Sequence, residues 1–252
     1  MKSAHSFNTE KLELDQFGVA TRIKPHEKSV YLVFTAHFSN FDNGHKNNFD
    51  GAEFILKSMA EHGVKGSFFP TGVCFEVERY QNVFHDIIDQ GHYLSGHSYA
   101  HLLLCDRNDR NKNLVTYDCI AKDNEKMEHQ LQRFGLKKEQ YEWMIPPYEY
   151  YNQFSADAYR ALGYRLANPT EGLDTATDWM SKDDPLYRSA DQLINNIWEF
   201  EKKHTLNGAI ILIHAINYPT RTDNDRPYKR LGDIITGIKS LGYDFKYFGE
   251  VV

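Results

Sequence analysis

Apolar and polar residues follow two patterns along the chain, one typical of β-strands and one typical of amphipathic helices. From Ser29 onward, short runs of β-prone apolar residues are separated by longer stretches in which apolar residues recur every three to four positions. The first run, residues 30–34, is apolar throughout, as expected for a parallel strand buried on both faces. The stretch after it has helical spacing and ends at Gly63, a typical C-capping residue. This alternation predicts βα units around a parallel sheet.

The same rhythm continues along the rest of the sequence. Ser189 and Gln192 have the spacing of a capping box at the start of one predicted helix. Further strands are predicted at residues 67–69, 93–95, 143–145, 165–167, 209–213 and 244–248, and further helices at residues 80–90, 115–134, 154–162 and 231–241. About seven strands without a linker predict one α/β domain over residues 29–252, closed into a barrel, with residues 1–28 as an N-terminal extension packed on it.

Composition and charge exclude several classes of protein. The 252 residues are 41% hydrophobic and 25% charged, unlike a disordered or collagen-like chain. The formal charge of -6 does not indicate binding to nucleic acid or to an anionic membrane. A neutral, polyhydroxylated ligand fits this charge better than a polyanion does. Cys74, Cys105 and Cys119 are odd in number and lack CxxC spacing, so we expect packed thiols rather than a disulfide framework.

Membrane and export signals are not evident in the sequence. No run approaches the roughly 18 apolar residues of a membrane span, and residues 1–18 contain no apolar core of a secretory signal. We therefore expect no membrane span. The cellular compartment stays open, because a chain without its signal would look the same.

Polar side chains follow most of the predicted strands. In parallel α/β folds, ligands meet the chain at the carboxyl ends of strands, where the loops diverge. The residues at these positions that could carry chemistry are His37, Asp42, His97, His101, Tyr148, Asp178 and His214. If the barrel closes, these side chains converge at one end of it.

The spacing of His97 and His101 is that of two side chains on one helical turn, where both imidazoles could reach a divalent metal. Asp42 could complete a site of two nitrogens and one oxygen, or it could simply form an Asx turn in a polar loop. His214 ends a strongly apolar strand, so it is either a core histidine or a side chain aimed into the site. The two prolines before Tyr148 either stiffen a turn or present its backbone N–H to a ligand.

Together these segments resemble the polysaccharide deacetylase family, the carbohydrate esterases with the NodB homology domain, over roughly residues 29–248. The most specific match is the run Gly-His-Ser-Tyr-Ala-His at residues 96–101, which is similar to the H-S-x-x-H metal motif. Residues 62–72, 145–148, 178–179 and 211–214 resemble four further family motifs, in the family's order. The resemblance implies a distorted (β/α)7-type barrel.

The resemblance also implies the chemistry, which is hydrolysis of N- or O-linked acetyl groups on a poly- or oligosaccharide. A divalent metal, with zinc as the expected ion, would be held by His97, His101 and Asp42. His214 would protonate the leaving group, and the backbone N–H of Tyr148 would stabilise the oxyanion. His37 would be the base if Asp42 binds the metal, and the two roles could also be exchanged. Asp178 would orient His214. The resemblance also implies a periplasmic or secreted protein.

The sequence departs from the family pattern at two places. Aligning on the first strand puts Thr35 and Ala36 where the family has its paired aspartates, whereas aligning on the distance to Gly63 preserves one of them as Asp42. The arginine of the family's R-P-P-Y loop is Ile145 here. The pattern therefore resembles that of a divergent branch of the polysaccharide deacetylase family. A catalytically weakened sugar-binding module and another metal-dependent C–N hydrolase of the same superfamily stay open as alternatives.

Overall fold

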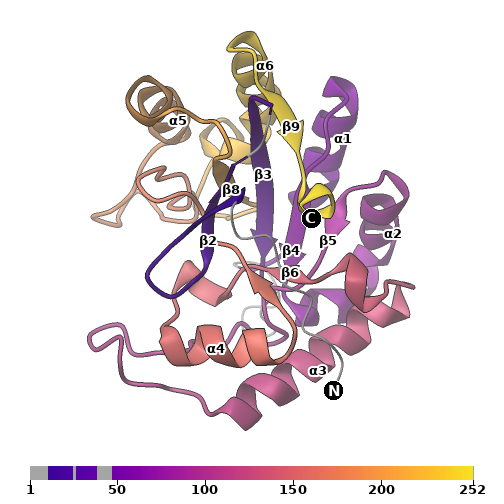
Figure 1. The fold of residues 1–252 in the computed structure, drawn as a ribbon. Coiled ribbons are helices and arrows are strands. Elements are labelled where there is room, and N and C mark those ends of the chain that lie inside the picture. Colours follow the sequence, from indigo (N-terminus) through magenta and orange to yellow (C-terminus); the bar gives the residue numbers. More distant parts are fainter. Residues whose placement is uncertain (1–10, 25–26, 39–46, 252) are drawn as a thin grey trace.

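The computed structural model describes residues 11–24, 27–38 and 47–251 of the chain. Its central strand is β3 (Ser29–Ala36), which is buried at every position. β3 pairs in parallel with β8 (Ile210–His214), β4 (Ser67–Pro70) and β9 (Asp244–Lys246), and β4 pairs in parallel with β5 (Tyr93–Leu94). Figure 1 shows this sheet at the centre of the molecule with helices around it.

Two further pairs of strands extend the sheet into a ring. β6 (Trp143–Met144) and β7 (Arg165–Leu166) form a parallel pair. β1 (Leu12–Leu14) and β2 (Ala20–Ile23) form an antiparallel hairpin, and β2 is bridged to Ala167 beyond β7 and to Ala209 before β8. On the opposite side, the hydroxyl of Tyr93 in β5 accepts a hydrogen bond from the backbone N–H of Trp143 in β6 at 2.8 Å. The result is a distorted (β/α)7 barrel in a single domain.

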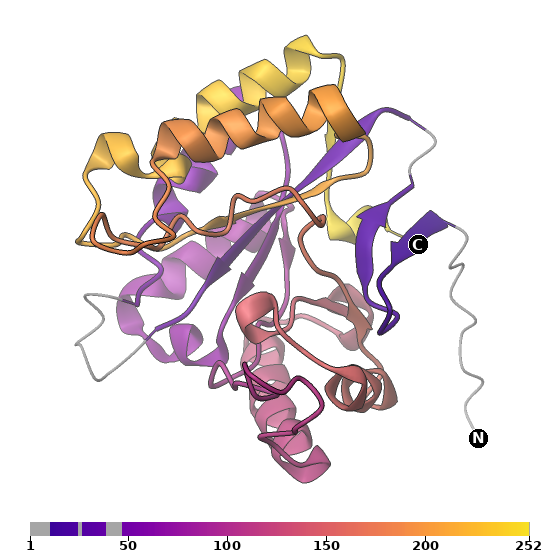
Figure 2. The ribbon, with the colours of Figure 1, turned by 90° about the vertical axis from the view of Figure 1, so that its left-hand side faces the viewer.

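The helices lie outside the ring of strands. They are α1 (Ala52–His62), α2 (Gln81–Asp89), α3 (Tyr117–Arg133), α4 (Gln153–Ala161), α5 (Ala190–His204) and α6 (Leu231–Ser240), and the 3₁₀ turns are Gly72–Glu76, Glu78–Tyr80, Lys138–Gln140, Pro147–Glu149, Asp223–Asp225, Pro227–Arg230 and Phe248–Glu250. Figure 2 shows α5 and α6 side by side along one flank, with α3 and α4 on the other. Of the helices in the described ranges, none is both long and apolar enough to span a membrane.

The sequence predictions for residues 29–248 agree with these elements to within a few positions at each boundary. Gly63 adopts φ 62° and caps α1, and the capping box of Ser189 and Gln192 is formed at the start of α5. The prediction of packed thiols is correct for Cys74 and Cys105 but wrong for Cys119, which is exposed on α3. The hairpin of β1 and β2 is a feature that the sequence did not indicate.

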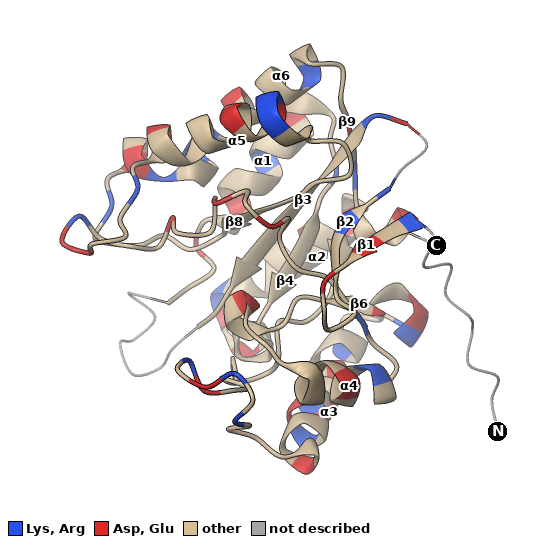
Figure 3. Ribbon diagram, turned by 60° about the vertical axis from the view of Figure 1, so that its left-hand side comes forward, with Lys and Arg blue, Asp and Glu red and all other residues tan. Residues whose placement is uncertain are grey.

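Side chains of alternate residues on each strand separate two hydrophobic clusters. Val30, Leu32 and Phe34 face outward toward the helices, whereas Tyr31 and Val33 face the barrel interior. In β8, Ile210 and Leu212 also face the interior. Charged residues of both signs are interspersed on the helices and loops, and the central strands carry almost none (Figure 3). The barrel interior is thus filled by apolar side chains beneath the carboxyl ends of the strands.

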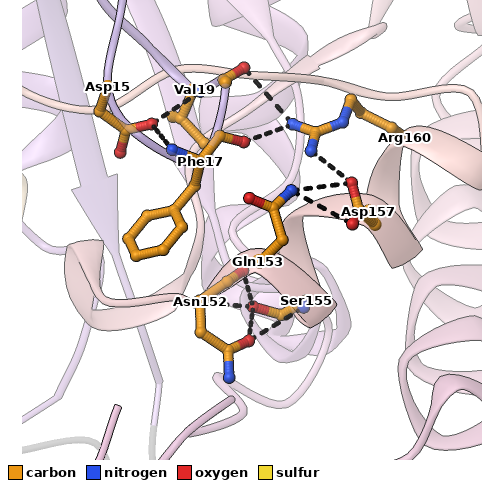
Figure 4. Close-up of polar contacts among 9 residues, drawn as sticks. Asp15, Phe17, Val19, Asn152, Gln153, Ser155, Asp157 and Arg160 are labelled. Carbon is orange, nitrogen blue, oxygen red and sulfur yellow. Dashed lines mark hydrogen bonds and ion pairs between the residues drawn. The ribbon is translucent and has the colours of Figure 1, made fainter. Parts of the chain in front are cut away.

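Hydrogen bonds join the turn between β1 and β2 to α4 (Figure 4). Asp15 accepts hydrogen bonds from the backbone N–H groups of Phe17 and Val19, at 2.8 and 2.9 Å. Arg160 donates to the carbonyl of Phe17 at 2.9 Å and forms an ion pair with Asp157 at 2.6 Å. These contacts hold the hairpin where β2 fills the space between β7 and β8. The domain boundary at residue 28 stays a prediction.

Candidate active site at the carboxyl ends of the strands

The alternation along β3 and β8 decides which side chains cap the apolar plug. Because side chains two residues apart lie on the same face of a strand, Thr35 continues the inward row of Tyr31 and Val33. His214 likewise continues the inward row of β8, and it pairs in register with Thr35. His214 therefore points into the carboxyl-terminal end of the barrel, as a site residue would, rather than outward into the helix layer.

His214 forms a buried pair with Asp178. Its Nδ1 donates to Asp178 Oδ1 at 2.6 Å, and its backbone N–H donates to Asp178 Oδ2 at 2.9 Å. Only 9% of the His214 side chain and 2% of the Asp178 side chain are exposed. Burial alone would lower the pKa of His214, but the charge and hydrogen bond of Asp178 outweigh it and raise that pKa. This arrangement fixes a proton on Nδ1 and turns Nε2 toward the site.

A buried arginine stabilises the loop that carries Asp178 by hydrogen bonds to its backbone carbonyls. The guanidinium of Arg221 donates to the carbonyls of Met180 at 2.8 Å and Arg188 at 2.7 Å. It also lies 3.5 Å from a carboxylate oxygen of Asp225, which balances its charge. Because Arg221 is almost fully buried, these contacts fix the loop between β7 and α5 instead of leaving it solvated.

His97 follows β5 and lies under the segment after β6. Its Nδ1 donates to the carbonyl of Ile145 at 2.8 Å, which leaves Nε2 for a ligand. The ring is almost completely buried. Burial lowers the pKa of His97 to about 3, and the hydrogen bond to Ile145 offsets only part of this effect. The imidazole is therefore neutral, which is the form that binds metals.

The expectation that His97 and His101 share a helical turn is wrong. The segment is an irregular loop, in which Ser98 and His101 have φ values of 65° and 56°. Asp123 of α3 organises this loop, because its carboxylate accepts hydrogen bonds from the Ser98 hydroxyl (2.7 Å) and from two loop amides (2.7 and 2.9 Å). The two imidazoles still meet, with ring centroids 5.0 Å apart and planes tilted by 46°.

His101 lies between two other predicted site residues. Its ring centroid is 4.4 Å from that of His37, with nearly parallel planes (12°), and 4.2 Å from that of Tyr148. Burial lowers the pKa of His101 well below the ordinary value, and the neighbouring histidines lower it further. Since imidazole lone pairs lie in the ring plane, two stacked parallel rings do not aim at one point. His97 and His101 are thus better placed to share an ion than His37 and His101.

The structure does not test one predicted site residue. Asp42 lies outside the described residues. In the cluster of Tyr148, Tyr150 and Tyr151, Tyr151 is buried and donates its hydroxyl proton to Asp15 at 2.7 Å. Of that cluster, Tyr148 is the exposed member.

Glu149 is a site residue that the sequence reasoning did not assign. Its Oε1 lies 3.8 Å from Nε2 of His97, and the side chain is 20% exposed. Burial raises the pKa of Glu149 to about 7, an effect that the nearby His214 partly offsets. Both Tyr148 and Glu149 have positive φ values, 61° and 52°. The available signal was an acidic residue directly after the Pro-Pro-Tyr turn at a strand end.

Whether these residues suit a metal can be judged from their donors. Within the described ranges, no group of three or more His, Cys, Asp or Glu side chains is placed so that it could hold a metal ion. Two neutral imidazoles, one of them oriented by a backbone carbonyl, and a buried carboxylate are nevertheless the donor types that zinc prefers. The donor types therefore suit zinc, although among the described residues they are not arranged around one ion.

Comparison with known proteins decides the family. The family profile described as polysaccharide deacetylase matches residues 23–167, which is more than half of the chain. The chain belongs to the polysaccharide deacetylase family. None of the curated proteins matches it in sequence.

Solved structures similar to this family member share its fold at low identity. A pseudoenzyme of carbohydrate esterase family 4 from Bacillus anthracis has 20% identity and a TM-score of 0.69, with 96% of this chain and 70% of that chain covered. The family 4 carbohydrate esterase PdaA of Bacillus subtilis has 21% identity and a TM-score of 0.67, with 94% and 85% covered. A peptidoglycan N-acetylglucosamine deacetylase, Bc1960, has 20% identity and a TM-score of 0.67, with 90% and 88% covered.

Proposed function

We propose that the chain is a metal-dependent hydrolase that removes N- or O-linked acetyl groups from an acetylated poly- or oligosaccharide. The observation that carries this proposal is the position of the buried His214–Asp178 pair, at the same end of the barrel as His97 and His101. A proton donor and a pair of metal-binding imidazoles are the two parts that such a hydrolysis requires. The family membership and a solved relative described as a peptidoglycan N-acetylglucosamine deacetylase support the substrate class.

The metal would be a divalent ion, with zinc expected, held by His97 and His101. A zinc ion at this place would polarise the acetyl carbonyl and lower the pKa of the attacking water. For the third ligand the sequence offers Asp42 or His37. The base that takes the proton of the water would be His37 if Asp42 is a ligand, or Asp42 if His37 is one.

Proton transfer to the leaving group would come from His214. Its Nε2 would give a proton to the departing amine nitrogen or sugar oxygen as the bond to the acetyl carbon breaks. Asp178 keeps the other proton on Nδ1 and stabilises the charged imidazolium, so it acts as a positioning residue. The backbone N–H of Tyr148, which follows Pro146 and Pro147, would donate to the oxyanion.

The rim of the site offers surfaces for sugar rings. Tyr148 and Trp179 are two large aromatic side chains with exposed fractions of 39% and 43%. Trp179 directly follows Asp178, and Tyr148 packs on His101. Aromatic faces at these two places would stack on a neutral glycan, which agrees with the net charge of -6.

A second candidate is a sugar-binding module with weakened catalysis. The end of β3 provides Thr35 and Ala36 rather than carboxylates, and Ile145 belongs to the apolar interior cluster where the family resemblance implies an arginine. A solved relative is itself described as a pseudoenzyme, and a mutant of it as having restored activity. The third alternative, hydrolysis of a cyclic amide, has no such observation in its favour.

Acetate release separates these candidates. The purified protein with zinc would be incubated with N-acetylglucosamine oligomers and with acetylated xylan, and acetate would be measured by an enzyme-coupled assay. We expect release from at least one substrate, a loss of at least about 100-fold in His214→Ala, and no change in His204→Ala, a matched control on the exposed end of α5. Sugar binding without acetate release by the wild-type protein would favour the sugar-binding module.

A further inference from the structure

The side chain of Glu149 brings an unsatisfied hydrogen-bond acceptor into the candidate site. Its Oε1 atom is buried and has no hydrogen-bond partner among the described residues. The atom lies 3.8 Å from Nε2 of His97, which is too far for a hydrogen bond. A buried polar atom without a partner costs free energy, and the cost is larger for a charged group. This oxygen therefore needs a donor that the described part of the chain does not supply.

The backbone at Glu149 is strained. Tyr148 and Glu149 are consecutive residues with positive φ values, a conformation that residues with a side chain rarely adopt. The turn is held by hydrogen bonds from the amides of Glu149 to Pro146 at 3.0 Å and of Tyr150 to Pro147 at 3.3 Å. Strain of this kind persists where the surrounding structure requires it, and it is concentrated at functional sites. Here the strained turn brings a carboxylate to His97 at the end of a strand.

Glu149 also lies within electrostatic reach of His214. Burial lowers the pKa of His214, but Asp178 and, after it, Glu149 act in the opposite direction, and the pKa is raised. In the proposed hydrolysis, His214 gives its proton to the atom that leaves the acetyl carbon. The leaving atom must therefore reach Nε2 of His214, in the same part of the site as the carboxylate of Glu149.

The leaving atom differs between the two kinds of acetylated sugar. In an N-acetyl sugar it is an amide nitrogen that carries a hydrogen atom, whereas in an O-acetyl sugar it is an ester oxygen that has only lone pairs. The amide N–H can donate to Oε1 of Glu149, but the ester oxygen would turn its lone pairs toward those of a buried carboxylate. A site built to accept a hydrogen bond from its substrate rejects an analogue that lacks the donor.

We propose that Oε1 of Glu149 accepts a hydrogen bond from the acetamido N–H of the substrate and thereby selects N-acetyl over O-acetyl sugars, an inference that rests on the proposed function. During hydrolysis, water adds to the acetyl carbon and the C–N bond breaks. The electron pair of that bond stays on nitrogen, which keeps the hydrogen that it donates to Glu149, takes a proton from His214 and leaves as the amine. The oxygen of the water leaves in acetate.

Matched substrates and two variants test this assignment. The protein with zinc would be assayed for acetate release from oligomers of N-acetylglucosamine and of 2-O-acetylglucose, which differ at the scissile bond by N–H against O. Glu149→Gly removes the acceptor, and glycine adopts a positive φ without strain, so this variant should fold. Glu149→Gln keeps an uncharged and weaker acceptor. Exposed Glu139, mutated to Gln, is the matched control, and circular dichroism checks the fold of each variant.

We expect Glu149→Gly to lower kcat/KM about 10- to 100-fold on the N-acetyl substrate and to change it by less than about twofold on the O-acetyl substrate. Glu149→Gln should lose less on the N-acetyl substrate, and Glu139→Gln should match the wild type on both. An equal loss on both substrates in Glu149→Gly, or no loss on either, would overturn the role of Glu149 and leave the proposed function standing. Absence of acetate release by the wild-type protein from both substrates would overturn the proposed function and this inference together.

Discussion

Replacement of Asp178 by asparagine tests the role of the His214–Asp178 pair most directly. The carboxylate now accepts two hydrogen bonds, from Nδ1 and from the backbone N–H of His214. An asparagine side chain has one oxygen and one NH₂ group, so it can accept only one of the two protons. If the oxygen keeps the backbone bond, the NH₂ group faces Nδ1 and favours the neutral tautomer with the proton on Nε2. The imidazolium form is then disfavoured.

The size of the effect follows from the burial of the pair. Removing one charge from a buried, hydrogen-bonded ion pair costs about 3–5 kcal/mol, and the lower end applies because one hydrogen bond survives. The pKa of His214, now raised by Asp178, therefore falls in Asp178→Asn. About 3 kcal/mol corresponds to a change of about 100-fold in the ratio of charged to neutral imidazole. At a pH where wild-type His214 is protonated, we expect about 100-fold lower kcat on an amide substrate.

The pH profile of kcat gives the sign of the effect. Proton donation requires the charged His214, so activity falls as the pH rises through its pKa, and Asp178→Asn moves this alkaline limb to lower pH. An aryl acetate with a good leaving group needs no proton from His214 and serves as the control substrate. An unchanged alkaline limb, or an equal loss on both substrates, would refute the proton-donor role. The stability that the pair contributes should be complete below about pH 6.5, the ordinary histidine pKa, and be lost as the pH rises through the raised pKa.

Four further predictions concern the loops around the site, the packing at Gly72 and the effect of metal removal. Asp123→Ala removes the acceptor of three hydrogen bonds in the loop between His97 and His101, so we expect urea denaturation to show a loss of about 3 kcal/mol in the free energy of unfolding, together with weaker Zn²⁺ binding. Arg221→Met leaves the carbonyls of the loop after β7 without their donor; limited proteolysis should show faster cleavage between residues 174 and 189, and kcat should fall. Gly72→Ala would place a Cβ 2.2 Å from the ring of Tyr99 and 2.9 Å from its Cα, and the melting temperature should drop by an amount equivalent to about 1–3 kcal/mol. A chelator should lower the melting temperature of the wild-type protein but not that of His97→Ala, as measured by calorimetry.

Strand alternation and helix capping were readable from the sequence because they depend on local spacing. The residues before His214 are apolar at every position, so the burial of this strand was evident. Because side chains alternate between the two faces of a strand, the inward direction of the His214 side chain followed once the sheet was known. The capping box of α5 depends on two residues three positions apart. Such features need no information about distant parts of the chain.

The loop geometry could not be read in the same way. The spacing of His97 and His101 suggested a helical turn, but Asp123, more than twenty residues away, imposes an irregular loop by accepting two of its amide protons. The approach of Glu149 to His97 depends on two consecutive left-handed residues, a conformation that neither Tyr nor Glu favours. In both cases long-range contacts override local preference, and a single sequence carries no direct sign of them.

The position of β2 between β7 and β8 has a consequence for how the chain folds. Arg22 donates to the carbonyls of Thr205 and Asn207, which lie 183 and 185 positions further along the chain. Pairing at such sequence distance raises the contact order, and the entropy of closing that loop must be overcome before the contact forms. During synthesis the hairpin leaves the ribosome well before these partners, which lie just ahead of β8. The ring therefore cannot close before residues 205–209 have been synthesised, and until then β2 lacks its neighbour on this side.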